Sequence, residues 1–306
     1  MHDPPSQNDL SRLARKIKPG LDGLLVIDKP GGMTSRDVVN RAQGWFPRRA
    51  RIGHAGTLDP LATGVLVLCI GRATRLIEYV QRLDKEYRAG IAFGARSDTD
   101  DAAGAITPVD EVVVPDKREV LEALTGFIGI IEQTPPAYSA AKITGRRAYD
   151  LARRGQSVDL RPRPVRIDAI DVLAFEYPRL DVVIRCGKGT YIRALARDLG
   201  QRLGCGAYLE SLRRTRIGPF HAGEACPLEI TATEARAALL DIAMAVTGLS
   251  RVTLPDADLA RLRQGQAVSL AACEPGEIAV FDARGGLAAI GACQAERNVL
   301  QPVKVL

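Results

Sequence analysis

The feature that most constrains the fold is a glycine-punctuated loop that runs directly into an apolar segment. Three glycines surround Asp59 within residues 53–64, and Val65 to Ile70 is continuously apolar. Pro60 biases the backbone of Asp59 toward extended geometry, and the apolar run predicts a buried strand. The loop therefore presents one carboxylate at the end of a rigid strand. From local chemistry alone, Asp59 is either an ordinary turn residue or a catalytic group.

Length and composition indicate a globular protein with more than one domain. At 306 residues, with 46% hydrophobic and 25% charged residues, the chain can bury one large core and a smaller one. No apolar run approaches the roughly 18 residues of a membrane span. Residues 1–20 are polar and basic and lack the apolar core of a signal peptide, so we expect a basic lead-in and a cytoplasmic protein without membrane association.

Positive charge is concentrated in one part of the chain. Ala141 to Phe220 holds 17 Lys plus Arg against 8 Asp plus Glu, a local net charge of +9, whereas the whole chain is +6 and the remainder is therefore −3. Arginine binds phosphate through paired donors, so this segment suits a polyanion. A solvated protein face is the alternative interpretation.

Neither the cysteines nor the histidines show the spacing of a metal site. The six cysteines contain no CxxC pair, which favours reduced thiols, and the three histidines are far apart. The acidic group Asp98, Asp100 and Asp101 lies in a turn-like segment, where capping and solvation are the usual roles of aspartate. We therefore expect no metal and no cofactor.

A second strand is predicted by strict alternation. In Lys85 to Phe93 the residues Tyr87, Ala89, Ile91 and Phe93 alternate with polar or small ones, which is typical of a half-buried strand and turns Tyr87 inward. Such a tyrosine is usually a core residue.

Further elements follow from apolar periodicity and from capping residues. Strands are expected at Gly23–Asp28, Val65–Ile70 and, as an antiparallel pair, Val165–Phe175 with Leu180–Cys186. Helices are expected from an N-cap at Ser35 through Trp45, at Thr74–Tyr79, Asp116–Gly126, Arg146–Arg154, after Gly187-Lys188-Gly189-Thr190-Tyr191, at Ala232–Val246 and at Ala257–Gln264. The apolar segments after Leu254 and the Gly285-Gly286 pair predict a small β-rich domain.

Several of these motifs, in order, resemble the TruB family of tRNA pseudouridine synthases. The run His54 to Leu66 is similar to the family's active-site motif, and Lys29-Pro30, Lys85-Glu86-Tyr87, Gly187 to Arg193 and Tyr208 to Thr215 are similar to its other blocks. The resemblance covers roughly Leu21 to Arg216. It is much weaker in the C-terminal part, whose placement resembles the family's PUA-type RNA-binding module.

The resemblance implies roles for individual residues. Asp59 stands at the place of the catalytic aspartate, as nucleophile or as base, with Arg193 as its ion-pair partner and Tyr87 stacked on the flipped base. Substrate contacts are implied for the pocket residues Tyr191 and Leu212, for Lys29 near the site, for His54 inserting into the RNA loop, and for Arg146 and Arg147 on phosphates. Lys29 in a plain strand-turn-helix, His54 bonded to the loop backbone, and arginines on a solvated face are the alternatives.

The implied fold is α+β, with a mixed, largely antiparallel central sheet, flanking helices and a small C-terminal β-barrel. We expect a lead-in at residues 1–20, a catalytic domain at 21–248 with an RNA-gripping insertion at about 130–163, and a PUA-like domain at 249–306. The implied reaction converts the T-loop uridine of tRNA, position 55, to pseudouridine by base flipping, with the T arm as partner and the protein as a monomer that needs no protein partner. A guide-RNA-dependent pseudouridine synthase and an RNA-folding chaperone with secondary catalysis are the alternatives.

Overall fold

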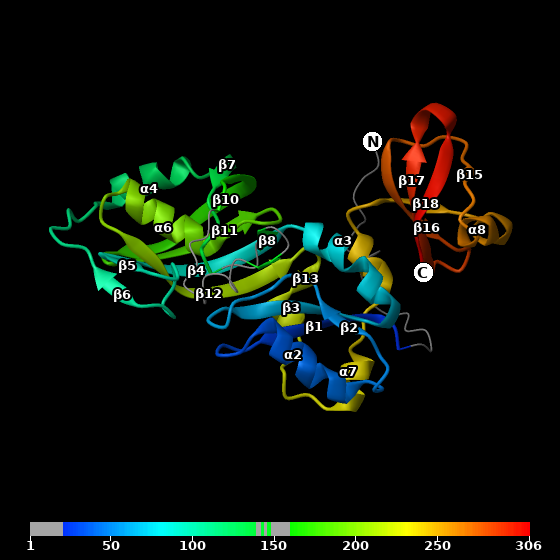
Figure 1. Cartoon of the computed structure of the whole chain (residues 1–306), viewed down its shortest axis with the longest axis horizontal. Coiled ribbons are helices and arrows are strands. Elements are labelled where there is room, and N and C mark those ends of the chain that lie inside the picture. Colours follow the sequence, from blue (N-terminus) through cyan, green and yellow to red (C-terminus); the bar gives the residue numbers. More distant parts are fainter. Residues whose placement is uncertain (1–20, 139–141, 144–145, 148–159) are drawn as a thin grey trace.

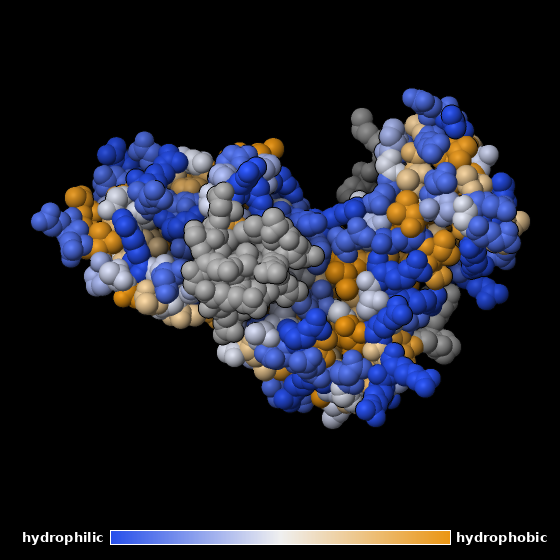
Figure 2. Space-filling model, viewed as in Figure 1, coloured by the Kyte–Doolittle hydropathy of each residue, from blue (hydrophilic) through white to orange (hydrophobic). Residues whose placement is uncertain are grey.

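The computed structural model describes residues 21–138, 142–143, 146–147 and 160–306. Two lobes are visible in Figure 1, an elongated one built on the larger sheet and a smaller one formed by the C-terminal residues. The space-filling view shows a notch between the two lobes (Figure 2). Residues 1–20, expected to form a basic lead-in, and half of the expected insertion lie outside the described residues.

Nine strands of the described part of the chain form the larger sheet, whose main order is β1-β3-β12-β4-β11-β10-β7. All pairings are antiparallel except that of β12 with β3. The sheet is therefore mixed and largely antiparallel, as predicted. Its strands are β1 (Gly23–Lys29), β2 (Ile52–His54), β3 (Thr63–Ile70), β4 (Lys85–Phe93), β7 (Gly129–Gln133), β10 (Arg163–Glu176), β11 (Arg179–Cys186), β12 (Ala207–Ile217) and β13 (Phe220–His221).

Helices flank this sheet and close separate apolar clusters. Helix α6 and helix α4 pack with β4 and β11 in one cluster, and α2 packs with β1 and β3 in another. The helices of this lobe are α2 (Ser35–Ala42), η1 (Gln43–Trp45), η2 (Gly71–Leu76), α3 (Ile77–Arg82), α4 (Lys117–Thr125), α6 (Ile192–Arg202), η3 (Ala222–Glu224), α7 (Ala232–Ala237) and η4 (Ile242–Val246). Two short hairpins complete it, β5 (Ala95–Ser97) with β6 (Ile106–Pro108) and β8 (Lys142–Ile143) with β9 (Arg146–Arg147).

The C-terminal lobe is a five-stranded sheet with its own core. The strand order is β14-β16-β17-β18-β15, and Leu254, Leu262 and Leu300 are among its buried residues. Phe281 and Ile290 from this sheet also join a cluster with Tyr79 of the larger lobe. The elements are β14 (Ser250–Thr253), α8 (Asp256–Arg263), β15 (Val268–Ser269), β16 (Gly276–Phe281), β17 (Leu287–Gln294), η5 (Ala295–Arg297) and β18 (Val299–Val305).

Most predicted strands are confirmed, and two helix predictions are wrong in detail. Thr34, not Ser35, is the N-cap of α2, with its hydroxyl accepting from the Asp37 amide. The predicted helix over Ala232–Val246 is interrupted, because the backbone of Leu240 pairs with that of Leu24 on β1. A residue that completes a sheet ladder cannot also continue a helix.

Two further expectations need correction. Arg146 and Arg147 form β9 and not the start of a helix, whereas the rest of the predicted helix, 148–154, lies outside the described residues. The cysteines are not all reduced, because Cys273 and Cys293 form a disulfide within the C-terminal lobe, with Cα atoms 6.0 Å apart. A separation of 20 residues gives no sequence signature for such a pair.

No helix of the described residues is long and apolar enough to cross a membrane.

Candidate active site

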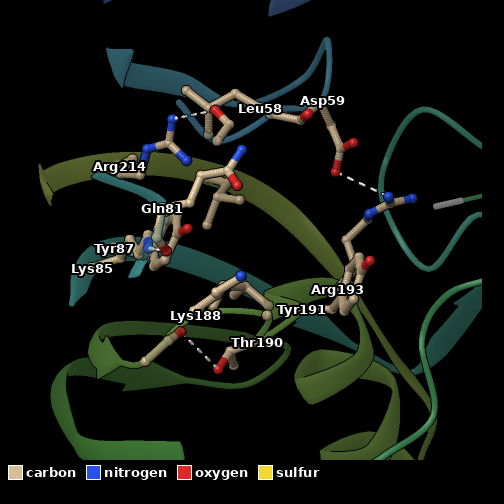
Figure 3. Close-up of a pocket in the computed structure, with 16 residues that line it drawn as sticks. Leu58, Asp59, Gln81, Lys85, Tyr87, Lys188, Thr190, Tyr191, Arg193 and Arg214 are labelled. Atoms are coloured by element: carbon tan, nitrogen blue, oxygen red, sulfur yellow. Dashed lines mark hydrogen bonds and ion pairs between the residues drawn. The ribbon is translucent and has the colours of Figure 1, made fainter. Parts of the chain in front are cut away.

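The Asp59 loop is fixed by hydrogen bonds to the first residue of α2 and to the turn between β1 and α2. The Leu58 amide donates to Ser35 Oγ at 2.8 Å, and the Ser35 hydroxyl donates to the Leu58 carbonyl at 3.1 Å. The Gly32 amide donates to the Pro60 carbonyl at 2.8 Å. Asp59 is therefore held from both sides, and its carboxylate points into the cavity drawn in Figure 3.

Gly64 lets the loop enter the sheet beside β12. Its φ is +98°, and a Cβ atom at this position would lie 2.2 Å from the Arg214 carbonyl oxygen. β3 and β12 run parallel at this point, with Gly64 opposite Arg214. Glycine is required both by the backbone angle and by the close approach.

Arg193 lies between two carboxylates. Its Nη2 atom is 3.0 Å from Asp59 Oδ2, and its Nη1 atom is 3.4 Å from Asp101 Oδ2. It also donates to the carbonyls of Thr99 and Tyr138, at 3.0 and 2.9 Å. Only 6% of the Arg193 side chain is exposed, so its geometry is fully determined by these partners. The predicted Asp59–Arg193 ion pair is present.

Two opposing effects act on the pKa of Asp59. The walls of the cavity remove solvent from the carboxylate and raise its pKa above the ordinary value, although 39% of the side chain faces the open cavity. The Arg193 guanidinium lowers the pKa, and the nearby Asp101 raises it. Burial has the larger effect, so the pKa is raised. Arg193 limits this rise and favours the ionised form.

The cavity has a volume of about 380 Å³, which suits a small planar ligand. Tyr87 and Leu212 lie on neighbouring strands, β4 and β12, and both line it. Burial raises the pKa of the Tyr87 hydroxyl. The other lining residues are Gly56, Thr57, Leu58, Asp59, Gln81, Lys85, Gly187, Lys188, Gly189, Thr190, Tyr191, Ile192, Arg193 and Arg214.

Tyr191, the N-cap of α6, connects the cavity to the strands that flank the insertion. Its amide donates to Gln133 Oε1 at 2.8 Å, and Gln133 Nε2 donates to its carbonyl at 3.0 Å. Its hydroxyl accepts from Arg163 Nη2 at 2.9 Å, and the Arg163 guanidinium lies 5.2 Å from the ring centroid. Gln133 ends β7 and Arg163 begins β10, so both ends of the segment between them are anchored to this tyrosine.

The structure does not place Lys29 in the cavity. Its side chain is completely buried and donates to the carbonyls of Pro30, at 2.8 Å, and Met33, at 2.7 Å, with Pro60 O at 3.5 Å. These bonds support the Asp59 loop, and the expected substrate contact of Lys29 remains a prediction. Burial lowers the Lys29 pKa to about 8.

His54 and the two predicted phosphate contacts lie outside the cavity lining. His54 is half-buried on β2, opposite Leu68 of β3. Arg146 and Arg147 form β9, which pairs with β8. Their predicted contacts with RNA remain predictions.

Sequence reasoning missed Asp101, Lys85 and Arg214. Asp101 was expected to be solvated, yet its side chain is only 6% exposed and pairs with Arg193. The signal was a pair of arginines four residues apart, Arg193 and Arg197, which face two neighbouring aspartates: Arg197 Nη1 is 2.9 Å from Asp100 Oδ2. Within the described ranges, no group of three or more His, Cys, Asp or Glu has the arrangement of a metal site.

Two family models match the chain. The model described as TruB family pseudouridylate synthase, N-terminal domain, matches residues 45–192, and the tRNA pseudouridylate synthase B C-terminal domain matches residues 193–245. A tRNA pseudouridine synthase B from Xanthomonas euvesicatoria pv. vesicatoria is 43% identical over 284 residues, covering 90% of this chain and 91% of the relative. The chain belongs to the TruB family. The relative of the same name from Mycobacteroides abscessus is 43% identical, covering 92% of this chain and 97% of its own length.

Solved structures confirm the pseudouridine synthase fold. A chain from a crystal structure of a Cbf5–Nop10–Gar1 complex is similar with a TM-score of 0.72 and 26% identity, covering 92% of this chain and 84% of that chain. A chain from an H/ACA RNP bound to a substrate RNA has a TM-score of 0.71 and 23% identity, covering 95% and 91%. Neither TruB family model extends into residues 246–306.

Proposed function

We propose that this TruB-family protein is a tRNA pseudouridine synthase that isomerises the T-loop uridine at position 55. The observation that carries the proposal is the Asp59 carboxylate, paired with Arg193 at 3.0 Å and facing a cavity lined by Tyr87 and Leu212. This arrangement has one ionisable carboxylate, an aromatic face and an apolar wall. A flipped pyrimidine needs these three features.

The reaction requires few protein groups. The bond between sugar C1′ and base N1 breaks, the base rotates, and C5 then bonds to C1′. C5 loses its proton and N1 gains one, so the product is an isomer of the substrate. Asp59 acts either as the nucleophile at C1′ or as the base that takes a proton from the sugar. In both cases it must be ionised, which Arg193 favours. Flipping the base costs a few kcal/mol, which stacking on Tyr87 and contacts to RNA phosphates offset.

Other residues are assigned supporting roles in the same proposal. Tyr191 and Leu212 enclose the base, and His54 inserts into the T loop in place of the flipped nucleotide. Arg146 and Arg147, in the insertion, contact phosphates of the T arm. Lys29 supports the Asp59 loop through the Pro60 carbonyl.

The deciding experiment uses the purified protein and a uridine-containing T-arm hairpin, with EDTA and with no other protein or RNA. Carbodiimide mapping should detect pseudouridine at the T-loop uridine with the wild type and none with Asp59→Asn, while the two bind RNA equally. This result would also establish action without a guide RNA, a protein partner or a metal. Binding without product from the wild type would contradict the proposal and favour guide-dependent action or RNA chaperoning.

The proposal includes the C-terminal lobe as a PUA-like RNA-binding domain of a monomeric cytoplasmic enzyme. Its support is a small five-stranded sheet with one flanking helix, in the place where the family resemblance puts that module. If the lobe contacts RNA beyond the T arm, ultraviolet crosslinking should label residues 249–306 with whole tRNA and not with the hairpin. Equal labelling with both RNAs would count against this role.

A further inference from the structure

Two cations lie beside the proposed base-binding residues on one face of the sheet. Lys85 and Tyr87 are two residues apart on β4, and Leu212 and Arg214 are two residues apart on β12. Residues two apart on a strand share a face. The strands are adjacent, with Arg214 opposite Tyr87, and all four side chains line the cavity. We call Lys85 and Arg214 the cationic floor.

Both cations of the floor are buried and held by neutral acceptors. Arg214 is 2% exposed, and it donates to the carbonyls of Val65, at 2.8 Å, and Gly56, at 3.0 Å. Lys85 is 7% exposed, and it donates to the carbonyls of Gln81 and Leu83. Within the described part of the chain, neither forms an ion pair with a carboxylate.

This arrangement is electrostatically unfavourable on its own. Burying a cation without an opposite charge costs free energy, and two such cations repel each other. The pKa of Lys85 reflects this cost, since burial and the nearby Arg214 together lower it to about 8, with Lys188 adding to the effect and Cys186 and Asp84 opposing it. An anion that forms in the cavity would relieve the cost.

The proposed reaction produces such an anion. When the C1′–N1 bond breaks, its electron pair stays on N1 and spreads over the O2 and O4 atoms of uracil. Asp59 acts on the sugar in this step. Figure 3 shows Lys85 and Arg214 on the other side of the cavity from Asp59 and Arg193. A preformed positive charge stabilises developing negative charge without reorganisation at the moment of reaction.

We infer that Lys85 and Arg214 stabilise the departing uracil as its anion, which makes them the electrostatic counterpart of Asp59. The inference rests on the proposed function. It assigns the leaving-group side of the reaction to two residues whose hydrogen bonds alone do not require a charge.

The test varies both the charge of the floor and the stability of the anion. Hairpins carry either uridine or 5-fluorouridine at the target position, because fluorine withdraws electrons and stabilises the anion by itself. Enzyme is in excess, and the first-order loss of the target nucleoside is measured after nuclease digestion. For Lys85→Met we expect a deficit on the order of 10²-fold with uridine. The deficit with 5-fluorouridine should be at least about threefold smaller.

Lys85→Gln is the second variant, because glutamine keeps a donor for the Gln81 and Leu83 carbonyls while it removes the charge. It should show the same dependence on fluorine. Lys117→Met removes an exposed lysine of α4 and should match the wild type with both hairpins. Melting temperature and RNA binding check that each variant is folded.

The outcomes separate the inference from the proposed function. Equal deficits with both nucleosides would mean that Lys85 only maintains structure, and an absent deficit would mean that its charge is not used; either overturns the inference. Failure of the wild type to convert uridine would instead overturn the proposed function.

Discussion

At one end of the cavity Arg193 has two carboxylates within ion-pair distance, whereas at the other end Lys85 and Arg214 have none among the described residues. At the first end opposite charges are already in contact before RNA arrives, and these salt bridges fix the direction of Asp59. The second end is unbalanced and is held by backbone carbonyls. The difference indicates that the first end positions the Asp59 carboxylate and that the second end can bind a negative charge of the substrate.

The largest expected effect comes from disturbing the close approach of Gly64 to Arg214, where β3 and β12 meet. Gly64→Ala places a Cβ atom 2.2 Å from the Arg214 carbonyl oxygen at a positive φ, so we expect a loss of about 4 kcal/mol or more of unfolding free energy. Gly32→Ala is the matched control, since its φ is +81° and nothing lies within 4 Å. It should cost only about 1–2 kcal/mol. Urea denaturation measures both, and equal losses would show that the close approach is unimportant.

Removing one of the two carboxylates beside Arg193 should slow the reaction without unfolding the protein. Asp101→Asn removes one of the two carboxylates that hold Arg193 and loosens its position, so we expect a rate loss on the order of 10²-fold in single-turnover conversion. Asp171→Asn, which breaks an exposed pair with Arg185, should leave the rate unchanged. An unaffected rate in Asp101→Asn would mean that the other partners of Arg193 are enough to orient it.

The same end should also control the pH dependence. The pKa of Asp59 is raised, so the carboxylate is protonated, and the rate falls, at a higher pH than for an ordinary aspartate. Arg193→Gln removes the charge that lowers this pKa and should move the acid limb of the rate profile to higher pH. Asp101→Asn removes a charge that raises it and should move the limb down. Shifts in the same direction would contradict this electrostatic account.

The smallest expected effect concerns the pH dependence of stability that two buried lysines cause. Burial lowers the pKa values of Lys29 and Lys85 from 10.5 to about 8. Between these values the unfolded chain binds more protons than the folded one, so these two residues make the unfolding free energy rise with pH across this window. Lys85→Met removes one of the two contributions. Urea denaturation at about pH 8 and pH 10 should therefore show a smaller rise for the variant; an equal rise would mean that Lys85 is not buried in its charged form.

The sequence predicted elements that depend on local pattern. The alternation in Lys85–Phe93 placed Tyr87 on the buried face, and the hairpin of β10 and β11 followed from two alternating segments joined at Tyr177-Pro178. The pairing of Asp59 with Arg193, which are 134 residues apart, was predicted from the family resemblance and not from periodicity. Their contact depends on how α6 packs onto the sheet, which no local pattern encodes.

The sequence did not predict features for which several residues of similar chemistry could take the same role. Thr34 and Ser35 are both good N-caps, and Ser35 lost the role because its hydroxyl bonds Leu58. Asp101 looks like any turn aspartate until Arg193 is placed beside it. Leu240 fits a helix locally, but its backbone pairs with Leu24 at the edge of β1. In each case a partner distant in sequence decided.

The shared apolar cluster between the lobes has a consequence for engineering. Phe281 and Ile290 pack with Tyr79 and Met244, and Glu277 accepts from the Tyr79 hydroxyl at 2.9 Å. A chain shortened to end near residue 248 would expose Tyr79 and Met244 to water and leave that hydroxyl without its acceptor. Such a miniature enzyme would be prone to aggregate, so attempts to reduce the protein to its catalytic part should first replace these side chains with polar ones.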